Sequence, residues 1–360
     1  MLDKKTADAT HRNTIYGTAG ITGHTSNLVT LLSSANISLL LSSPAANSFY
    51  LICSRAGELV QCSLGIDQPR AVAAANGRIA LAAGNEIYEL FSVPAALAML
   101  DPSGGYDACF ITHKRHITGR MGIQDMAWCQ NELWLASSRY SCLATLDSQY
   151  SFAPRWLPPF ITQFIEGDRC HLSGLAVRDG VPRYATALAE SDHVMVWDQH
   201  RTDGGVLVDI ATGRCIVRNL CMPFSPRWHA GELWVLEAGK GALLRVDSGS
   251  GHFHEIIRLP GFARGLAFFG HLAFIGLSQL PADYSLTDLP VTADGGSLMN
   301  GIAVVNVELK RLVALLRFGP ELVDVSALEL IDNVRCPYLA VPQEHPELHA
   351  QALNLPRCVL

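Results

Sequence analysis

The 360-residue sequence has little of what marks several large protein classes. Charged residues make up only 17% of the chain and the formal net charge is −6. Sequence-independent binding of nucleic acid needs a broad basic face, so we expect no nucleic-acid partner. The apolar run at residues 37–41 is too short to cross a bilayer, and the first twenty residues hold no apolar signal core. We therefore expect a cytoplasmic protein without a membrane partner.

Several familiar enzyme motifs are also absent from the sequence. The ten cysteines form no CxxC pair, which disfavours a zinc ribbon, and in a cytosolic protein most should be reduced, small and buried. Lys240 lacks the GxxxxGK[ST] spacing of a P-loop, and no GxSxG nucleophile elbow occurs. We accordingly expect no metal and no cofactor.

What the sequence does contain is a recurring β unit. Amphipathic helices are scarce, residues 93–100 and 344–353 being the best candidates, and the rest consists of short apolar strands between turn residues. The unit is an apolar run, a turn and a second strand, most clearly in MAWCQNELWLAS (126–137) and WHAGELWVLEAG (228–239). Four strands per unit of about 40–50 residues predict propeller blades. The second strands start near Ala80, Trp134, Tyr184, Trp234, Phe274 and Tyr338.

We predict an all-β fold, a six-bladed β-propeller over residues 36–342, with an N-terminal extension (1–35) and a C-terminal tail (343–360). The last unit runs out of chain after two strands, whereas residues 48–64 supply two strands without inner partners. N-terminal strands that complete the C-terminal blade would close the ring and leave no open sheet edge, with residues 37–43 as an extra strand. Because the spacing of the units varies, five and seven blades remain alternatives.

Polar residues precede the inner strand of each unit, which places them at one mouth of the central channel, where ligands usually bind. Three are arginines, and a guanidinium binds carboxylate or phosphate through two donors. The mouth is therefore suited to a small anionic molecule, although struts between blades, in which the arginines pair with nearby acids, remain an alternative. The candidate substrate-binding residues are Arg70, Gln124, Ser173, Arg227 and Arg264, with Arg139 and Glu237 in loops after second strands.

The candidate catalytic residues are His171, in the stretch DRCHLSGLA, and Asp125. Histidine suits acid–base chemistry near neutral pH, whereas a metal site would need two or three further ligands. The equivalent places in neighbouring units hold Gln124 and Phe224, so the sequence gives a metal little support. A structural role, a substrate contact and an acid–base role all stay open for His171.

The runs SSRYSCLATLD, SFAPRWLPPFI, DRCHLSGLA, MPFSPRW and LPGFARGLAF resemble a family of bacterial conserved hypothetical proteins that carry a domain of unknown function. The resemblance covers about residues 122–317 and implies a β-propeller-like fold without an assured activity. Family members typically have histidine where this chain has Gln124 and Phe224, and asparagine in place of Ser173, while His171 matches. If relatives use a three-histidine cluster, this chain keeps one of the three, which argues against a metal here.

Two classes of function follow. The first is an enzyme of the cyclase, lyase or isomerase type that acts on an anionic substrate at the channel mouth. The second is a non-catalytic propeller that binds a protein or peptide through the long insertions at 189–205 and 279–300, with Trp197 and Tyr284 in the contact surface. The fold alone does not decide, because propellers serve both functions, and a homo-oligomer is compatible with either.

Overall fold

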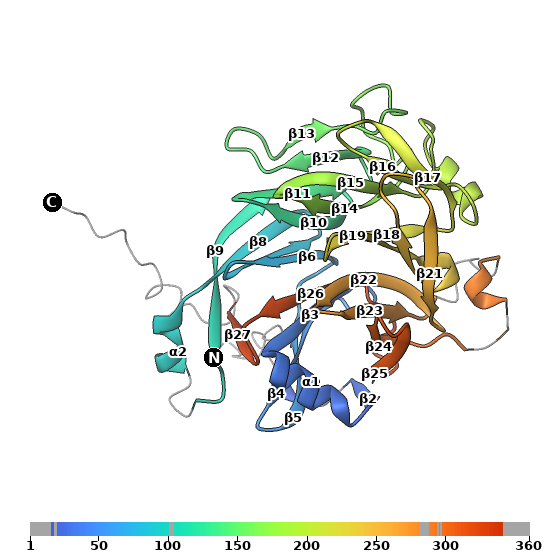
Figure 1. Ribbon diagram of the computed structural model, residues 1–360. Coiled ribbons are helices and arrows are strands. Elements are labelled where there is room, and N and C mark those ends of the chain that lie inside the picture. The colour runs from blue at the N-terminus through green and yellow to red at the C-terminus, as the bar shows by residue number, and fades with distance from the viewer. Residues whose placement is uncertain are drawn as a thin grey trace, which may run out of the picture.

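Six β-sheets stand around a common axis in the computed structural model, which describes residues 16–17, 20–100, 104–280, 288–293, 295 and 297–340 (Figure 1). Each sheet is a blade of four or five strands. The predicted six-bladed β-propeller is thereby confirmed. The inner strands contact one another in ring order: β26 (Ala327–Asp332), β6 (Pro69–Ala75), β10 (Ile123–Cys129), β14 (Leu172–Arg178), β18 (Pro223–His229) and β22 (Phe262–Phe269), which returns to β26.

Every blade is named here by its inner strand, and the β10, β14 and β18 blades consist of consecutive strands. The first hairpins of the β6, β14 and β18 blades turn at Asn76–Gly77, Asp179–Gly180 and Ala230–Gly231, and both residues of each pair have positive φ. Such turns have a twist that matches the flanking strands, which explains the regular strand–turn–strand repeat. In the β10 blade, the strands that follow are β11 (Glu132–Ser137), β12 (Cys142–Thr145) and β13 (Ala153–Trp156). In the β14 blade they are β15 (Val181–Ala187), β16 (Gly205–Asp209) and β17 (Arg214–Leu220). In the β18 blade they are β19 (Glu232–Glu237), β20 (Ala242–Val246) and β21 (Phe253–Arg258).

The other three blades borrow strands from the two ends of the described chain. In the β22 blade, β2 (Ile21–His24) lies outside β23 (Leu272–Ser278), β24 (Gly301–Asn306) and β25 (Arg311–Phe318). In the β6 blade, β27 (Pro337–Ala340) runs parallel to β9 (Ala108–Ile117), beyond β7 (Arg78–Ala83) and β8 (Glu86–Ser92). These additions tie the chain ends to blades on both sides of the closing blade.

The closing blade combines both ends of the chain. Its inner strand β26 pairs with β3 (Ile37–Ser43), which is followed outward by β4 (Ser48–Arg55), β5 (Glu58–Leu64) and β1 (Tyr16–Gly17). Figure 1 shows β26 in red beside β3 in blue. N-terminal strands therefore complete the C-terminal blade, as the sequence predicts, with residues 37–43 next to the inner strand.

One detail of that prediction is wrong. The second strand of the last unit, around Tyr338, does not pair with β26, because the uninterrupted, fully buried strand β3 takes that place and β27 joins the next blade. Within the segment predicted as an N-terminal extension, α1 (Asn27–Ala35) packs Leu28 and Leu32 into the core and β2 extends a blade. The helix expected at 93–100 is confirmed as α2 (Pro94–Leu100), whereas 344–353 lies outside the described residues.

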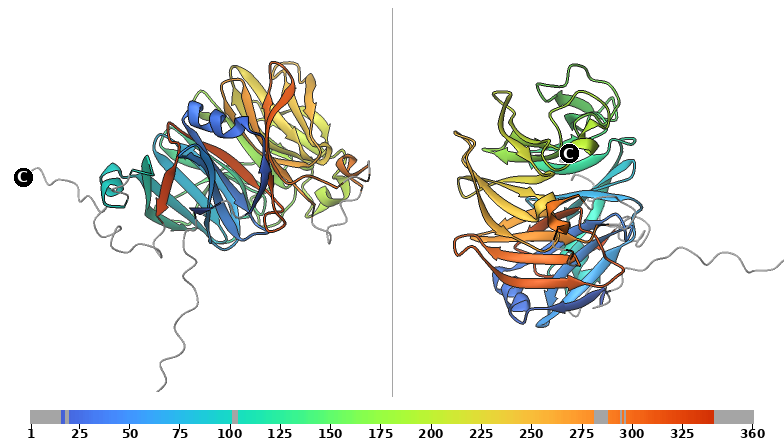
Figure 2. Two further views of the ribbon diagram at one scale, coloured as in Figure 1. Left: turned by 90° about the horizontal axis from the view of Figure 1, so that it is seen from below. Right: turned by 90° about the vertical axis from the view of Figure 1, so that its right-hand side faces the viewer.

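The core lies between neighbouring blades rather than in one central mass. Met126 and Leu135 of the β10 blade, for example, pack on Ala80 and Ile87 of the β6 blade. Both short helices, α1 in blue and α2 in teal, lie at the periphery of the sheets (Figure 2). No helix in the described part of the chain is long and apolar enough to cross a membrane.

Candidate functional site

A bulge near the start of five inner strands places polar side chains at one mouth of the channel. The strand register shifts within each of these five hairpins, whereas β26 pairs with β3 without interruption. A bulged residue leaves the hydrogen-bonded ladder, so its side chain can be aimed away from the sheet. The shifts enclose Arg70, Gln124, Ser173, Ser225 and Arg264.

Next to these bulges, Arg227 of β18 connects alternate blades across the axis. Its Nη1 lies 2.8 Å from Asp125 Oδ2 and its Nη2 lies 3.2 Å from Glu329 Oε1. Its Nε donates to the carbonyl of Leu266 at 3.0 Å. Asp125 also accepts the backbone N–H of Leu175, so one partly buried ion network joins the β10, β14, β18, β22 and β26 blades.

The charges of this network depend on one another. Burial opposes the charge of Arg227, but the facing carboxylates of Asp125 and Glu329 raise its pKa above the ordinary value. Burial raises the pKa of Glu329 to about 7, a shift that Arg227 opposes and Asp125 reinforces. Since the donors of Arg227 are engaged and Asp125 is only 4% exposed, the geometry favours the strut alternative for both. We therefore assign Asp125 and Arg227 to the scaffold rather than to a substrate.

Arg264 is in the opposite situation. Its Nη2 donates to Gln124 Oε1 at 3.1 Å and its guanidinium lies 4.3 Å above the ring of Phe224. Among the described residues no carboxylate reaches ion-pair distance of Arg264, and its Nε is buried without a hydrogen-bond partner. Burial and the charge of Arg70 lower the pKa of Arg264 to about 10. The side chains Arg70, Gln124, Arg264 and Asp324 form what we call the polar mouth.

Asp324 is the acidic member of the polar mouth. Its Oδ1 accepts a hydrogen bond from Ser43 Oγ at 2.5 Å and one from the backbone N–H of Ala45 at 3.2 Å. Burial nevertheless raises its pKa, while the charges of Arg264 and Arg70 act in the opposite direction. Arg70 and Arg264 are thus near enough to Asp324 to influence it, but within the described residues neither forms an ion pair with it.

His171 lies at the start of β14 and forms a dyad with Asp168. Its Nδ1 is 2.7 Å from Asp168 Oδ2, and its ring centroid is 4.4 Å from that of Trp197, in the insertion at 189–205. No partner for Nε2 is found among the described residues, and His171 keeps 15% of its side chain exposed. Two buried polar atoms beside this ring, Asp168 Oδ1 and Trp197 Nε1, also lack a partner within the described part of the chain. Buried polar atoms are normally satisfied, so this spot is suited to water or a polar ligand.

Phe224 connects the dyad with the polar mouth. Its ring faces Arg264, and it belongs to an apolar cluster with Leu188, Phe262 and Leu289. Trp197, from the short helix η1 (Val196–His200), packs against the same cluster. Both long insertions thus meet beside the mouth, because Leu289 immediately precedes η3 (Pro290–Thr292). Tyr284, expected in a contact surface, lies outside the described residues.

Comparison with known proteins places the chain in a family. The family model described as "Domain of unknown function (DUF4915)" matches residues 26–340. The chain belongs to the DUF4915 family. The match confirms the resemblance drawn from the sequence runs and extends it beyond residues 122–317. No curated protein matches the sequence.

Solved structures resemble this DUF4915 member in fold alone. A chain of a nidogen/laminin complex is 9% identical with a TM-score of 0.52, covering 82% of this chain and 99% of that chain. A protein of unknown function from Bacteroides caccae is 12% identical with a TM-score of 0.54, covering 82% and 98%. Virginiamycin B lyase from Staphylococcus aureus is 10% identical with a TM-score of 0.41, covering 78% and 91%.

Three further sequence candidates in this DUF4915 chain have local partners. Ser173 is buried, and its Oγ donates to the carbonyl of Pro223 at 2.6 Å, which ties β14 to β18. Arg139 pairs with Glu166, and Glu237 pairs with Lys240 at 2.6 Å while accepting the backbone N–H of Cys221. The contacts of Ser173 and Glu237 are buried, whereas Arg139 and Glu166 form an exposed pair.

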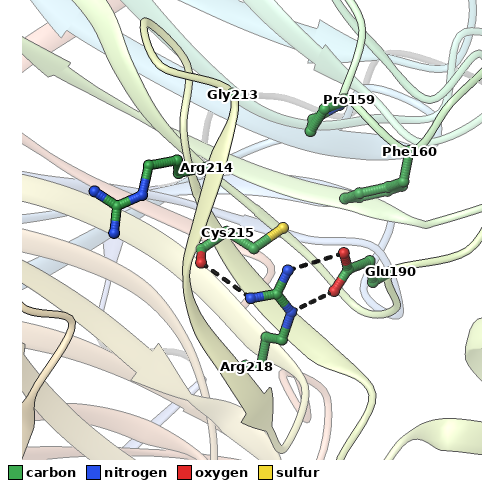
Figure 3. A pocket seen from close by; sticks show the side chains of 7 residues that line it. All are labelled: Pro159, Phe160, Glu190, Gly213, Arg214, Cys215 and Arg218. Atoms are coloured by element: carbon green, nitrogen blue, oxygen red, sulfur yellow. Dashed lines mark hydrogen bonds and ion pairs between the residues drawn. The ribbon is translucent and has the colours of Figure 1, made fainter.

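A separate cavity of about 470 Å³ lies on the outer side of the β14 blade (Figure 3). Glu190 binds Arg218 through two hydrogen bonds of 2.6 and 3.1 Å, and Figure 3 shows Arg214 pointing away from this pair. Burial raises the pKa of the Cys215 thiol to about 11, so the thiol is a poor nucleophile near neutral pH. Because Glu190 and Arg218 neutralise each other, this cavity has fewer unpaired charged groups that could bind a ligand than the polar mouth has. It is lined by Pro159, Phe160, Glu190, Gly213, Arg214, Cys215 and Arg218.

No group of three or more His, Cys, Asp or Glu side chains within the described residues is arranged to hold a metal ion. The residues that sequence reasoning missed as site members are Asp168, Trp197 and Asp324. Asp168 precedes His171 by three positions in the run DRCH. The backbone of His171 has a positive φ, which brings the two side chains together, and this conformation could not be predicted from the residue types. The sequence predicts Trp197 only in the contact surface of a protein- or peptide-binding propeller, not beside His171.

Proposed function

We propose that this propeller binds a small molecule with a carboxylate or phosphate group at the polar mouth, and that His171 moves a proton on that molecule. The observation that carries the proposal is the guanidinium of Arg264. It is partly buried with its Nε enclosed, its charge is opposed by that of Arg70, and its close partners among the described side chains are only an amide oxygen and an aromatic ring. The comparisons support the fold on which this site is built.

The electrostatics of Arg264 favour an anionic ligand. Removing a charge from water is costly unless the charge is paired, and this desolvation is the main cause that lowers the pKa of Arg264 to about 10. The group still carries its charge at neutral pH, so a bound anion would restore a counter-charge and supply an acceptor for Nε. Arginine offers planar, two-donor recognition of carboxylate and phosphate. Perturbed groups of this kind are common at functional sites.

The dyad supports proton transfer. When His171 Nδ1–H donates to Asp168, Nε2 is the nitrogen that can accept or deliver a proton. Asp168 then acts as a positioning residue, because it fixes the tautomer and the ring orientation. Chemistry of the lyase, isomerase or cyclase type needs such a proton shuttle beside an anionic anchor.

Binding can be tested with a panel of small mono- and dicarboxylates and phosphate esters, measured by thermal shift and calorimetry. We expect at least one class of anion to bind the native protein, and Arg264→Met and Arg70→Gln to weaken it at least tenfold. Arg214→Gln removes an exposed arginine in the outer cavity and should leave Kd unchanged. Equal loss of affinity in Arg214→Gln, or no binding by any anion in the panel, would reject the proposal.

The role of His171 is tested on an anion that binds, with conversion followed by NMR. His171→Gln should retain Kd and lose about 10²–10⁴-fold in turnover. Asp168→Asn should shift the pH profile rather than abolish binding, because it changes the tautomer that the ring prefers. Unchanged turnover in His171→Gln would leave a binding protein without acid–base catalysis at this residue.

An interaction propeller remains the second candidate, because two loops beside the dyad expose apolar side chains. Phe164 and Ile165 are 41% and 52% exposed, and Val194 and Met195 are 59% and 47% exposed. The loops run side by side, since the N–H of Met195 donates to the carbonyl of Asp168 at 2.8 Å. If a peptide binds here, selection from a peptide library should yield apolar sequences whose affinity falls in Ile165→Ser and Val194→Ser but not in Arg264→Met.

A further inference from the structure

Two cysteines meet where the ends of the chain close the ring. Cys53 lies in β4, and Cys336 lies in the bend between β26 and β27. Their sulfur atoms are 3.0 Å apart, although the two residues are 283 positions apart in the sequence. Both side chains are buried.

Packed backbone fixes Cys336 opposite Cys53. The carboxylate of Asp107 accepts the backbone N–H of Arg335 at 2.7 Å and that of Cys336 at 2.8 Å. The N–H of Asp107 donates in turn to the carbonyl of Cys336 at 3.2 Å. Cys53 is held in β4 by its pairing with Val60 of β5, directly after Ile52, which pairs with Leu39 of β3. The closeness of the sulfurs therefore follows from two anchored segments rather than from one adaptable loop.

We infer that Cys53 and Cys336 are an oxidative modification site, at which a disulfide closes the propeller ring covalently. The inference does not depend on the proposed function, because it concerns the closing blade and not the mouth. In its reduced form, the closing blade joins the two chain ends through the backbone hydrogen bonds of β26 and β3 and side-chain packing. A bond from β4 to the segment after β26 would hold both ends of the chain in one blade.

The oxidant can be hydrogen peroxide. One thiolate attacks a peroxide oxygen, which breaks the O–O bond and gives a sulfenic acid and, after protonation, one water. The second sulfur then attacks the sulfenic sulfur and expels a second water, while its own proton leaves with the oxygen. Two thiols and one peroxide thus give one disulfide and two waters. Cys336 is better placed to react first, because it follows exposed Arg335 while Cys53 is fully buried.

The reduced pair should react slowly at neutral pH. The contact with Cys336 and burial both raise the pKa of Cys53, so little thiolate is present. Once formed, the disulfide would close a very long loop, which is the geometry in which a cross-link restricts the unfolded chain most. We expect the oxidised protein to melt about 5 °C or more above the reduced protein.

The experiment treats the native full chain with hydrogen peroxide, blocks remaining thiols and maps peptides by mass spectrometry without reductant. We expect a peptide that joins Cys53 to Cys336, a mass loss of about 2 Da, and a melting temperature that rises and returns with dithiothreitol. Cys53→Ser and Cys336→Ala should each abolish both changes, whereas Cys142→Ala, at a buried cysteine of another blade, should keep them.

The mapping of the unaltered chain decides the matter even if a variant folds poorly. Peroxide that oxidises other thiols while Cys53 and Cys336 stay reduced would overturn the inference. So would a linked peptide that joins either residue to a different cysteine, or a cross-link that leaves the melting temperature unchanged.

Discussion

Arg227 and Arg264 lie in adjacent blades and show two environments of a partly buried guanidinium. Arg227 is matched by two carboxylates, whereas Arg264 has none at ion-pair distance in the described structure. Removing one partner of a buried ion network leaves uncompensated charge and costs about 3–5 kcal/mol. The same change at Arg264, whose charge has no ion-pair partner among the described residues, removes a desolvation cost and leaves no carboxylate uncompensated.

We therefore expect Arg227→Met to lower the free energy of unfolding by about 3–5 kcal/mol, and Arg264→Met to change it by less than about 1 kcal/mol or to raise it. Urea unfolding of both variants measures the contrast. Equal losses would mean that Arg264 has a structural partner after all.

Glu329 predicts how stability depends on pH. Its pKa of about 7 lies above the ordinary 4.5, so the folded state holds this proton more tightly than the unfolded state does. Its contribution to stability is present below pH 4.5 and is lost as the pH rises to 7.

Glu329→Gln removes the titration but can still accept from Arg227. Compared with the native protein, we expect the variant to gain up to about 3 kcal/mol in relative stability between pH 4.5 and pH 8. Urea unfolding at both pH values gives the difference. A constant difference would show that Glu329 does not titrate between these pH values.

At the scale of the element, the bulges decide where the mouth residues point. Gly265 lies in the bulge of β22 with φ +77°, and a Cβ there would come within 2.7 Å of the backbone nitrogen of Leu328 in β26. The close approach of the β22 and β26 blades thus requires a glycine at this position.

Gly265→Ala should therefore cost about 3 kcal/mol or more, since it combines a left-handed conformation with a backbone clash. Gly270→Ala is the matched control, because Gly270 also has positive φ but open space around its Cα, and should cost about 1 kcal/mol. Thermal unfolding compares the two. Equal costs would mean that the β22 and β26 blades can move apart to accommodate the added methyl group without further loss of stability.

The same elements show what sequence can predict. Hairpins such as the one at Asp179–Gly180 were visible because they depend on neighbouring residues and a recurring turn. The positions of Arg70, Gln124 and Arg264, just before the inner strand of each unit, could be predicted for the same reason. The parallel pairing of β27 with β9 was missed because it joins residues far apart in sequence. The partners of Arg227 come from other blades, so the choice between strut and ligand contact needed the three-dimensional structure.

At the scale of the whole molecule, the closed ring makes the blades depend on one another. Leu328 of β26 is fully buried and packs in one cluster with Phe274 and Val304 of the β22 blade and Ile52 of its own blade. A cavity at this junction weakens contacts on both sides of it.

We expect Leu328→Ala to lower the free energy of unfolding by about 2–5 kcal/mol, with far-ultraviolet circular dichroism and tryptophan fluorescence shifting together. Leu312→Ala, at a side chain that is 43% exposed, should change stability by less than about 0.5 kcal/mol. Separate transitions for the two probes would show that the closing blade unfolds on its own.

The ring closure also determines how the molecule would respond to a pulling force. Ile37 at the start of β3 faces Asp332 at the end of β26, so tension on the two ends would open this ladder one hydrogen bond at a time. That tension must first detach β1 from β5, β2 from β25 and β27 from β9. The mechanical load therefore falls on outer strands of three blades before it reaches the pairing of β3 with β26.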